Sequence, residues 1–359
     1  MSLTSEHRAL LGAYRMPAEW APHLATYLIW PHNPDTWPGK FELIAAAYAE
    51  IVAALSQFEP VRLLVKEAGL FEQVRATIAR ASNPPRLDHI ELIAIPTNDS
   101  WVRDTGPIFV NRIAAVDGPP QLVLNWRFNS WGEKWGAHDL DDAVPRRLAE
   151  HYGFTRIEPG IVLEGGSIDV NGAGALLTTE SCLLNRNRNP RLERSEIEDY
   201  LRACLGVSNV LWLGDGIAGD DTDGHVDDLT RFVARDTAVT VVEDDPTDAN
   251  YAALRDNLAR LRSMRLEDGG ALRIETLPMP PAVLDGDVRL PASYANFYIV
   301  NGGVLMPAFG CESDQVAREA LVRLFPRRRV LDIPSRELVL GLGSVHCLSQ
   351  QQPMPPSAQ

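Results

Sequence analysis

The sequence predicts an α/β fold in which five modules, each with a hairpin, an amphipathic helix and a strand, close into a ring. Two observations predict this fold. The same order of apolar segments, turn signals and helical periodicity recurs along the chain, with little sequence identity between the copies. Hairpins that start at Pro107, Ile168, Leu229 and Phe297 lie 61, 61 and 68 residues apart, and this near-constant spacing indicates one module copied several times.

Two modules lie in the first half of the chain. The first has PIFVNRIAAV and QLVLNW around Asp117-Gly118, a strong hairpin turn signal, and continues with a helix over 141–152 and the strand GIVLE. The second has SIDV and ALLTTE around Asn171-Gly172, followed by a helix over 191–205 and the strand NVLWL.

Two further modules follow in the second half. One has the paired segment DLTRFVARDTAVTVVE, a helix over 248–264 and the strand RIETL. The other has NFYIV and VLMPAF around Asn301-Gly302-Gly303, a helix over 313–324 and the strand RVLDI. Their helical segments show the apolar period of a helix with one buried face.

The two ends of the chain together predict the fifth module. ATYLIWP and VRLLVK are typical of strands, an amphipathic helix over 40–58 lies between them, and HCLSQQQ would be the missing hairpin partner. This closure removes exposed sheet edges, which favour aggregation. A helix over 71–81 and the strand IELIAIP complete the segment. We expect one domain over 1–350 and a flexible Pro-rich tail over 351–359, with an ordinary two-domain α/β protein as the alternative.

Composition restricts the function. The 359 residues carry a formal net charge of −14, so neither a nucleic-acid binder nor an anionic-membrane binder is expected, whereas a small cationic substrate is compatible. The N-terminus lacks the apolar segment of a signal peptide, and Glu42 and Glu50 interrupt the longest apolar helical segment. The four cysteines show no C-x-x-C spacing. These features favour a cytoplasmic protein without disulfides.

The reactive residues fall at equivalent places in the repeat. The junctions between one module and the next are TNDSWVRDTGP, LEGGS, GDGIAGDDTDGHVDD, LPASYAN and GLGSVHC. In a ring these Gly-rich, polar junctions converge on one axis, and functional groups typically lie on loops held by a rigid scaffold. The junctions carry Asp104, Glu164, His225, Asp227 and Cys347.

Cys347 is the candidate nucleophile. It follows a Gly-x-Gly turn at a predicted strand start, and although a free cysteine is usually a small buried hydrophobe, the convergence of the junctions favours catalysis. The other cysteines are expected to be such hydrophobes: Cys182, Cys204 and Cys311. His225 lies among carboxylates that favour its imidazolium form, which suits proton transfer near neutral pH. His346 is the less favoured partner, since adjacent strand residues point to opposite faces.

Three acids, Asp104, Glu164 and Asp227, predict a cation site. Each alone is more commonly a helix cap or a solvated loop acid, but three at one site repel one another unless something positive binds. A guanidinium ion supplies that charge, and its planar N–H donors pair bidentately with carboxylates. Trp101 would cover the cation with its ring face.

Six motifs, in order along the whole chain, resemble those of the agmatine deiminases and the related bacterial peptidylarginine-deiminase-like proteins: WVRDTGP, LEGGS, SCLLNRNRNP, GDDTDGHVDD, NFYIVNGGV and GLGSVHCLSQQQP. These families belong to the guanidino-group-modifying superfamily of five-bladed α/β propellers, or penteins. The resemblance implies that fold. It also implies Cys347 as nucleophile, His225 as general acid and base, and the three acids as guanidinium-binding carboxylates.

The resemblance further implies an activity without cofactor or metal: a covalent Cys amidino-thioether forms, ammonia leaves, and agmatine becomes N-carbamoylputrescine, a step of polyamine biosynthesis. A homodimer is a further implication. The segment before Cys347 departs from the family pattern, because Leu342 stands where a Gly is usual and Ser344 where an Asn is usual. Deimination of arginine or peptidyl-arginine, and amidino transfer, therefore remain alternatives.

Three rivals come from other classes. Gly214 to Gly219 reads G-x-G-x-x-G after the strand VLWL, as in NAD-dependent oxidoreductases, but the acidic residues that follow would repel a pyrophosphate. The Asp and His of the same loop are also possible ligands of a hydrolytic zinc ion. A non-catalytic binding module is disfavoured because all five expected polar groups are present.

Overall fold

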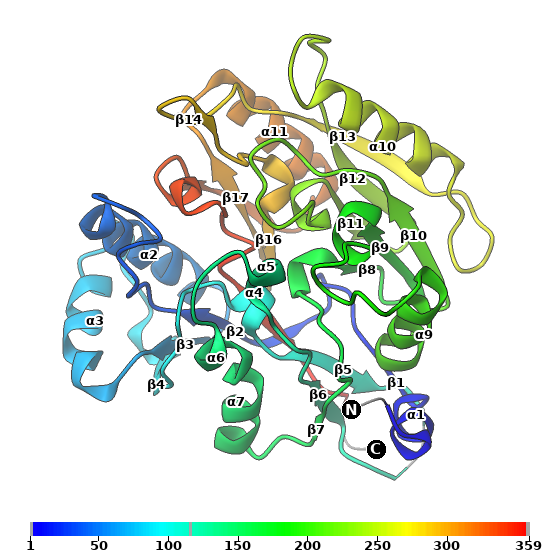
Figure 1. Ribbon diagram of the computed structural model, residues 1–359. Helices are drawn as coiled ribbons and strands as arrows, with labels where there is room; N and C mark the ends of the chain where they lie inside the picture. Colours follow the sequence, from blue (N-terminus) through cyan, green and yellow to red (C-terminus); the bar gives the residue numbers. More distant parts are fainter. Residues whose placement is uncertain (1–2, 115–116, 357–359) are drawn as a thin grey trace.

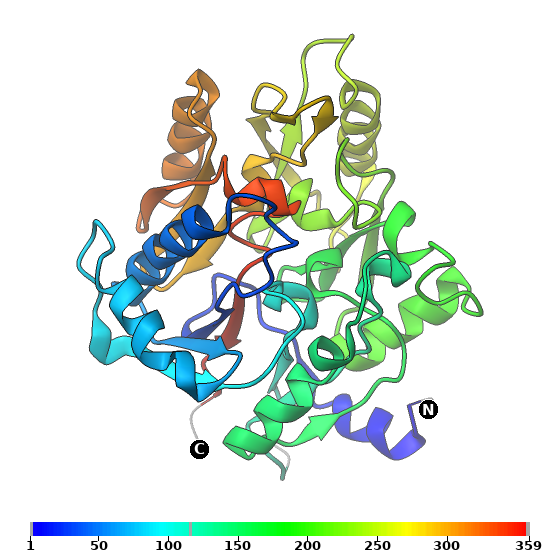
Figure 2. The same ribbon diagram turned by 60° about the vertical axis from the view of Figure 1, so that its left-hand side comes forward.

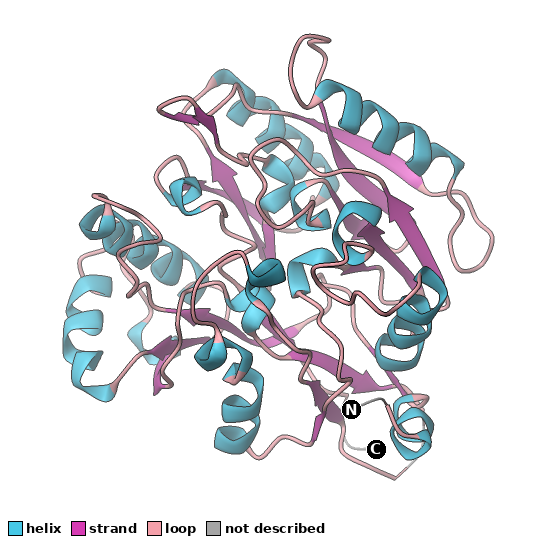
Figure 3. Cartoon of the chain, viewed as in Figure 1, coloured by secondary structure: helices cyan, strands magenta, loops and turns pink. Residues whose placement is uncertain are grey.

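Five of the six sheets formed by the described residues are arranged in a ring, with the longer helices on its outside (Figure 1, Figure 3). The structure is a computed structural model and describes residues 3–114 and 117–356. The predicted ring of α/β modules is confirmed, and each module forms one blade.

Four blades have the predicted order of an antiparallel hairpin, a helix and a third strand parallel to the second. The first strand of each of these blades begins one residue after the hairpin start predicted from the sequence. The hairpins are β5 (Ile108–Arg112) with β6 (Gln121–Leu124), β8 (Asp169–Val170) with β9 (Ala175–Thr179), β11 (Thr230–Ala234) with β12 (Thr237–Val242), and β16 (Tyr298–Val300) with β17 (Gly303–Ala308). The third strands are β7 (Arg156–Ile157), β10 (Asn209–Leu213), β13 (Arg273–Pro278) and β18 (Arg329–Pro334).

The fifth blade joins the two ends of the chain, as predicted. Strand β19 (Gln350–Pro353) pairs antiparallel with β2 (His23–Ile29), and β3 (Val61–Val65) and β4 (Ile90–Ala94) continue the sheet in parallel. Because β19 includes residues 351–353, the expected tail boundary was wrong, and the final residues 357–359 lie outside the described part. The single-domain assignment stays a prediction.

The helices lie close to their predicted positions and cover the outer faces of the sheets (Figure 2). Helix α9 shows why its bounds are sharp: Glu193 and Glu196 form a capping box at its start, and Gly206 ends it with a φ of 66°. The main helices are α2 (Phe41–Ser56), α3 (Phe71–Ile78), α7 (Val144–Tyr152), α9 (Arg194–Leu205), α10 (Tyr251–Ser263) and α11 (Glu312–Leu324).

One predicted strand was misplaced. GIVLE is not the third strand of its blade; β7 precedes it, and Val162 makes only an isolated bridge to Arg127. Pro159 lacks an N–H, and Gly160 adopts a φ of 88°, so the extended segment is interrupted before it reaches GIVLE. The hairpin turn signal at Asp117-Gly118 borders residues 115–116, which lie outside the described residues.

Short elements fill the junctions and the periphery. Each of four junctions contains a short helical turn, and successive turns contact one another around the centre of the ring: α4 (Val102–Thr105), η3 (Gly165–Ser167), η4 (Val226–Asp228) and η5 (Tyr294–Asn296). The remaining elements are α1 (Ser5–Leu11), β1 (Tyr14–Arg15), η1 (Ala68–Leu70), η2 (Leu87–His89), α5 (Ser130–Glu133), α6 (Asp139–Asp142), α8 (Glu180–Leu183), β14 (Leu284–Asp285), β15 (Val288–Arg289) and η6 (Leu338–Gly341). Among the described helices, none is long and apolar enough to cross a membrane.

Candidate active site

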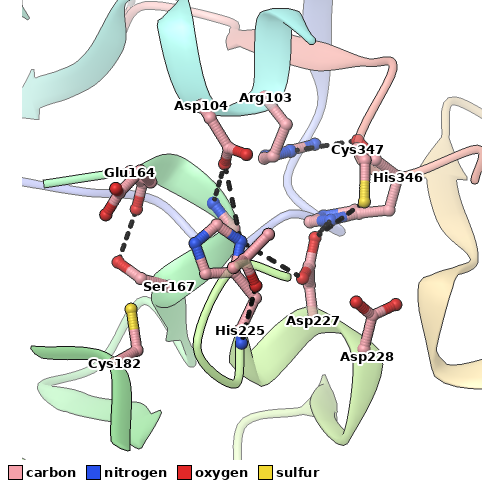
Figure 4. A network of polar contacts seen from close by, with 12 residues as sticks. Arg103, Asp104, Glu164, Ser167, Cys182, His225, Asp227, Asp228, His346 and Cys347 are labelled. Atoms are coloured by element: carbon pink, nitrogen blue, oxygen red, sulfur yellow. Dashed lines mark hydrogen bonds and ion pairs between the residues drawn. The ribbon is translucent and has the colours of Figure 1, made fainter. Parts of the chain in front are cut away.

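The structure brings the five residues singled out in the junctions together at the centre of the ring (Figure 4). His225 Nδ1 lies 3.8 Å from Asp104 Oδ1 and 4.0 Å from Asp227 Oδ1. Cys347 Sγ lies 3.7 Å from Asp227 Oδ2. A carboxylate oxygen of Glu164 lies within 4.8 Å of a ring nitrogen of His225. All five side chains are buried, so their charges interact with little screening by water.

A cavity of about 780 Å³ reaches this centre from outside. Cys347, Asp104 and Trp101 line its inner end. Behind them, Glu164 Oε2, His225 Nε2 and Asp227 Oδ1 are buried without a hydrogen-bond partner in the structure. Unpaired buried polar atoms are costly, so three of them near the inner end of the cavity indicate a polar ligand.

Cys347 lies in a turn and not at a strand start, because β19 begins only at Gln350. Its Sγ accepts a hydrogen bond of 3.0 Å from Asn296 Nδ2. Burial, together with the carboxyl groups of Asp227, Asp228 and Asp104, raises the pKa of the thiol well above its ordinary value. Without a bound ligand, Cys347 is therefore mainly a thiol at neutral pH.

His225 has the opposite protonation preference. Burial alone lowers the pKa of its imidazole, but Asp104, the Cys182 thiol and Asp227 outweigh burial and raise the pKa well above its ordinary value. The ring is therefore protonated at neutral pH. Its backbone N–H donates to Asp220 Oδ2 at 3.0 Å, which fixes the acidic loop from which the ring projects.

Asp104 is held from two sides. Its Oδ1 accepts from Gly166 N and its Oδ2 from Trp131 Nε1, both at 2.9 Å. A Cβ on Gly166 would lie 2.6 Å from His225 Nδ1 and 2.9 Å from Asp104 Oδ1, so glycine is required there. Burial, with Asp227 and Glu164, raises the pKa of Asp104, and His225 acts against this.

Trp131 was not predicted from the sequence. It lies in a segment with three non-glycine residues in the left-handed region, Ser130 (φ 56°), Trp131 (φ 51°) and Glu133 (φ 63°). Such conformations cost about 1–3 kcal/mol each and concentrate at functional sites. Here the segment places the indole N–H on Asp104 and the ring in the cavity wall.

Glu164 is fully buried, and only one of its two carboxylate oxygens has a hydrogen-bond partner. Arg188 Nε donates to its Oε1 at 2.8 Å, while Arg188 also bonds Asp223 and the Thr222 carbonyl oxygen. The second oxygen, Oε2, remains available to a ligand. Arg188 comes from the quoted motif SCLLNRNRNP, but its contact with Glu164 across the fold has no signal in the sequence.

Asp227 is oriented by His346. His346 Nδ1 lies 2.7 Å from Asp227 Oδ2, and His346 Nε2 lies 2.8 Å from Glu19 Oε2. Burial favours the neutral acid of Asp227, but the His346 hydrogen bond and charge outweigh it, and its pKa is lowered. His346 therefore belongs to the site through its contact with Asp227. The opposite-faces argument does not hold, because His346 and Cys347 lie in a turn and not in a strand, while the choice of His225 as the partner of Cys347 stays a prediction.

Asp228 and Asn296 were also missed. Asn296 Nδ2 donates to Asp228 Oδ1 at 2.9 Å as well as to Cys347. Burial, with Asp227 and Asp220, raises the pKa of Asp228 well above its ordinary value, so this carboxyl group is neutral beside an ionised Asp227. Both residues stand in the quoted junctions, but only their contacts with the thiol pocket distinguish them.

The segment before Cys347 is shaped by Trp101. A Cβ on Gly343 would lie 2.4 Å from the Trp101 ring, so this glycine lets the chain pass over the indole. Leu342 adopts a left-handed φ of 69°, the conformation that glycine accepts without strain, and its side chain lines the cavity. The departure from the family pattern at position 342 therefore carries backbone strain.

Two groups of potential metal-binding side chains occur among the described residues, and we assign neither as a metal site. In the first, Glu164, Cys182 and His225, Glu164 already pairs with Arg188. In the second, Asp227, Asp228 and Cys347 are engaged by His346 and Asn296. Gly214 to Gly219 is followed by a loop and η4, without the helix that a dinucleotide pyrophosphate needs.

Comparisons with known proteins agree with this architecture. A family model described as Porphyromonas-type peptidyl-arginine deiminase matches residues 15–353. An agmatine deiminase of Ectopseudomonas mendocina (strain ymp) is 40% identical over 381 aligned positions, covering 99% of this chain and 100% of that protein.

Solved structures show the same fold. The agmatine deiminase of Enterococcus faecalis, described as catalysing its reaction, is 34% identical with a TM-score of 0.88, covering 96% of this chain and 97% of that chain. A C. jejuni agmatine deiminase with substrate bound is 29% identical with a TM-score of 0.84, covering 95% and 97%. The protein is thus a guanidino-group-modifying α/β propeller. Within that class, the chain belongs to the Porphyromonas-type peptidyl-arginine deiminase family.

Proposed function

We propose that the protein hydrolyses agmatine to N-carbamoylputrescine and ammonia through a covalent intermediate on Cys347. The observation that carries this proposal is a thiol at the inner end of a cavity whose neighbouring carboxylates keep unpaired oxygens. Glu164 Oε2 and Asp227 Oδ1 have no hydrogen-bond partner and can accept from the N–H groups of a guanidinium, and Asp104 lines the cavity. Family membership and the agmatine deiminases among its relatives support the same substrate.

The chemistry proceeds in two halves. When the guanidinium binds, its positive charge offsets the carboxylates, and the Cys347 thiol releases its proton to solvent. The resulting thiolate attacks the guanidinium carbon, a C–S bond forms, and the C–N bond breaks as the protonated His225 donates to the nitrogen that leaves as ammonia, which produces an amidino-thioether. His225 then takes a proton from water, the resulting hydroxide attacks the same carbon, and the thiolate leaves with a urea-type product. His225 starts as an acid because its pKa is raised, which suits the first half.

The cavity lining favours a substrate with a second positive charge. Six aspartates and one lysine line the cavity, and no arginine is among the described lining residues. An α-carboxylate, as in free arginine, would meet these carboxylates, whereas the terminal ammonium of agmatine would be attracted. The aspartates are Asp35, Asp99, Asp104, Asp141, Asp221 and Asp285, and the lysine is Lys66.

The test is ammonia release from agmatine, free arginine and a blocked arginine peptide, with Cys347→Ala as the matched blank. We expect agmatine to give the highest kcat/KM, and activity to be lost on thiol alkylation but kept with a chelator. Preference for arginine or the peptide would overturn the substrate assignment. Activity of Cys347→Ala, or its loss with a chelator, would overturn the cysteine mechanism.

We also propose a cytoplasmic homodimer. Four free cysteines support a reducing compartment, and the dimer rests on the family resemblance alone. Fractionation of the producing cells and light scattering of the purified protein test these two statements.

A further inference from the structure

We propose that Glu19 is a positioning residue for the reaction: through His346 it holds Asp227 in the orientation and charge state in which this carboxylate binds the guanidinium. The inference rests on the proposed function, in which Asp227 is one of the guanidinium-binding acids. Glu19 lies in the turn between β1 and β2 and precedes His346 by 327 positions in the sequence. It stands outside all five junctions of the ring.

A chain of contacts connects Glu19 to the place of the substrate. His346 Nε2 lies 2.8 Å from Glu19 Oε2, and His346 Nδ1 lies 2.7 Å from Asp227 Oδ2 (Figure 4). The other oxygen of Asp227, Oδ1, has no hydrogen-bond partner in the structure. The imidazole therefore engages one oxygen of Asp227 and leaves the other to accept from an N–H group of the guanidinium.

Both ring nitrogens of His346 face a carboxylate oxygen, and this arrangement needs two N–H donors. A neutral imidazole has only one, so its second nitrogen would direct a lone pair at the second carboxylate. Burial alone would raise the pKa of Glu19, but Arg231 and His346 outweigh burial and lower this pKa well below its ordinary value. Since the pKa of Asp227 is lowered as well, both acids are ionised, and the ring between them is an imidazolium.

Glu19 is itself fixed by several groups, so it can orient the ring. The side chain is buried, its Oε1 accepts from Ile299 N at 2.8 Å, and its Oε2 accepts from Arg231 Nη2 at 2.7 Å. Arg103 Nη2 lies 3.7 Å from the same oxygen. The backbone carbonyl oxygen of Glu19 accepts from His23 Nε2 at 2.7 Å, which holds the turn against the start of β2.

Asp169 provides a matched comparison, because it binds the same arginine. Its Oδ2 accepts from Arg231 Nε at 2.5 Å and its Oδ1 from Phe232 N at 2.9 Å. Like Glu19 it is buried, but no contact between Asp169 and His346 is found among the described residues. A role that only stabilises the fold through Arg231 is therefore shared by the two acids, whereas a role through His346 belongs to Glu19.

Two variants separate these roles. Glu19→Gln keeps the shape of the side chain but loses its charge and one of its two acceptor oxygens. Asp169→Asn makes the same chemical change on the other carboxylate of Arg231. If Glu19 only stabilises the fold, both variants should lower the thermal unfolding midpoint and keep the kinetics of the wild type. If Glu19 acts on Asp227, only Glu19→Gln should weaken the binding of the cation.

The first measurement is steady-state ammonia release from agmatine by the full-length variants, with circular dichroism to establish that they are folded. Glu19→Gln should lower kcat/KM about 10- to 100-fold, mainly through a higher KM, because a hydrogen bond to a charged group is lost. Asp169→Asn should stay within about threefold. A wild-type KM in folded Glu19→Gln, or an equal change in Asp169→Asn, would overturn the inference.

The second measurement needs no substrate. It is ¹⁵N NMR at pH 7 of protein labelled at its histidines, with His346→Gln to identify the resonances of this ring. Both nitrogens of His346 should be protonated in the wild type and in Asp169→Asn, whereas the ring should become neutral in Glu19→Gln. A neutral ring in the wild type would overturn the inference even if Glu19→Gln failed to fold.

The failure of the proposed function would look different. Agmatine turnover by Cys347→Ala would show that the cysteine mechanism is wrong, while the protonation of His346 in the substrate-free protein would be unaffected. The two failures are therefore distinguishable.

Discussion

Two buried thiols lie on opposite sides of the same site, and only one of them meets the requirements of a nucleophile. Cys347 lies in the turn before β19, whereas Cys182 lies in α8, directly after the Thr179 cap. Burial raises the pKa of both thiols, and both have acidic neighbours. Cys347, however, lines the cavity and accepts from Asn296, while Cys182 is fully buried, beside His225 and Glu164 and against an apolar cluster. Access to the cavity, and not burial or charge, distinguishes the two thiols.

The largest expected effect is the loss of Cys347. Cys347→Ala should lower kcat by more than about 10³-fold, because Cys347 is the described thiol that lines the cavity and Cys182, although near Glu164, is fully buried. Steady-state ammonia release measures it, and an unchanged thermal midpoint would show that the fold is kept. If the activity of Cys347→Ala stayed within tenfold of wild type, Cys347 would not differ from Cys182 as a nucleophile.

The carboxylates beside Cys347 should have opposite effects on turnover and on thiol reactivity. Asp104→Asn should lower kcat/KM for agmatine about 10²- to 10³-fold by weakening cation binding and charge placement. The same change should speed alkylation of Cys347, because the Asp104 charge is one of the causes that raise the pKa of this thiol. Slower alkylation in Asp104→Asn would contradict the electrostatic account.

The pH dependence of alkylation should separate the thiols directly. Because the pKa of Cys347 is raised, its alkylation rate in the free enzyme should increase about tenfold per pH unit from pH 7 to 9, without a plateau. Cys182 should stay unmodified until the protein unfolds, since it has no exposed surface. Peptide mapping after timed alkylation measures both. A plateau below pH 8 for Cys347 would show that its thiol is not destabilised.

Leu342, in the segment before Cys347, is one source of backbone strain near the thiol. Leu342→Gly should raise the free energy of unfolding by about 0.5–1 kcal/mol, because glycine accepts the left-handed φ that strains leucine. Denaturant unfolding of the variant and of wild type gives the difference. Destabilisation would mean that the Leu342 side chain contributes more to packing than the backbone loses.

The smallest effect is expected from the replacement of Cys182, the thiol on the other side of the site. Cys182→Ala should keep kcat/KM within about threefold and lower stability by about 1 kcal/mol through the small cavity it leaves. A loss of activity in Cys182→Ala as large as that in Cys347→Ala would contradict the conclusion that only Cys347 acts in the reaction. In that case the thiol beside His225 would take part in proton transfer.

The sequence predicted the ring because repetition is a property of the chain itself. Four hairpin starts lie 61, 61 and 68 residues apart, and the two ends of the chain together complete one more module, so the sequence predicted five blades. The first strand of each of the four hairpins begins one residue after its predicted start. The exception was GIVLE, where apolar composition suggested a strand but Pro159 and Gly160 interrupt the pairing. The junctions also brought Cys347, His225 and the three acids into one candidate site.

Tertiary structure decided which partners these residues have. The contact of His346 with Asp227 depends on a turn where we had expected a strand, and Arg188 reaches Glu164 through a fold that its own motif does not encode. The 3.0 Å contact of Asn296 with the sulfur of Cys347 was not detectable, because a neutral amide carries no charge pattern and the two residues are 51 positions apart in the sequence. Periodicity and spacing are local properties of the sequence and can be recognised in it. The hydrogen bonds between blades join residues far apart in the sequence, so they form only when the ring has closed.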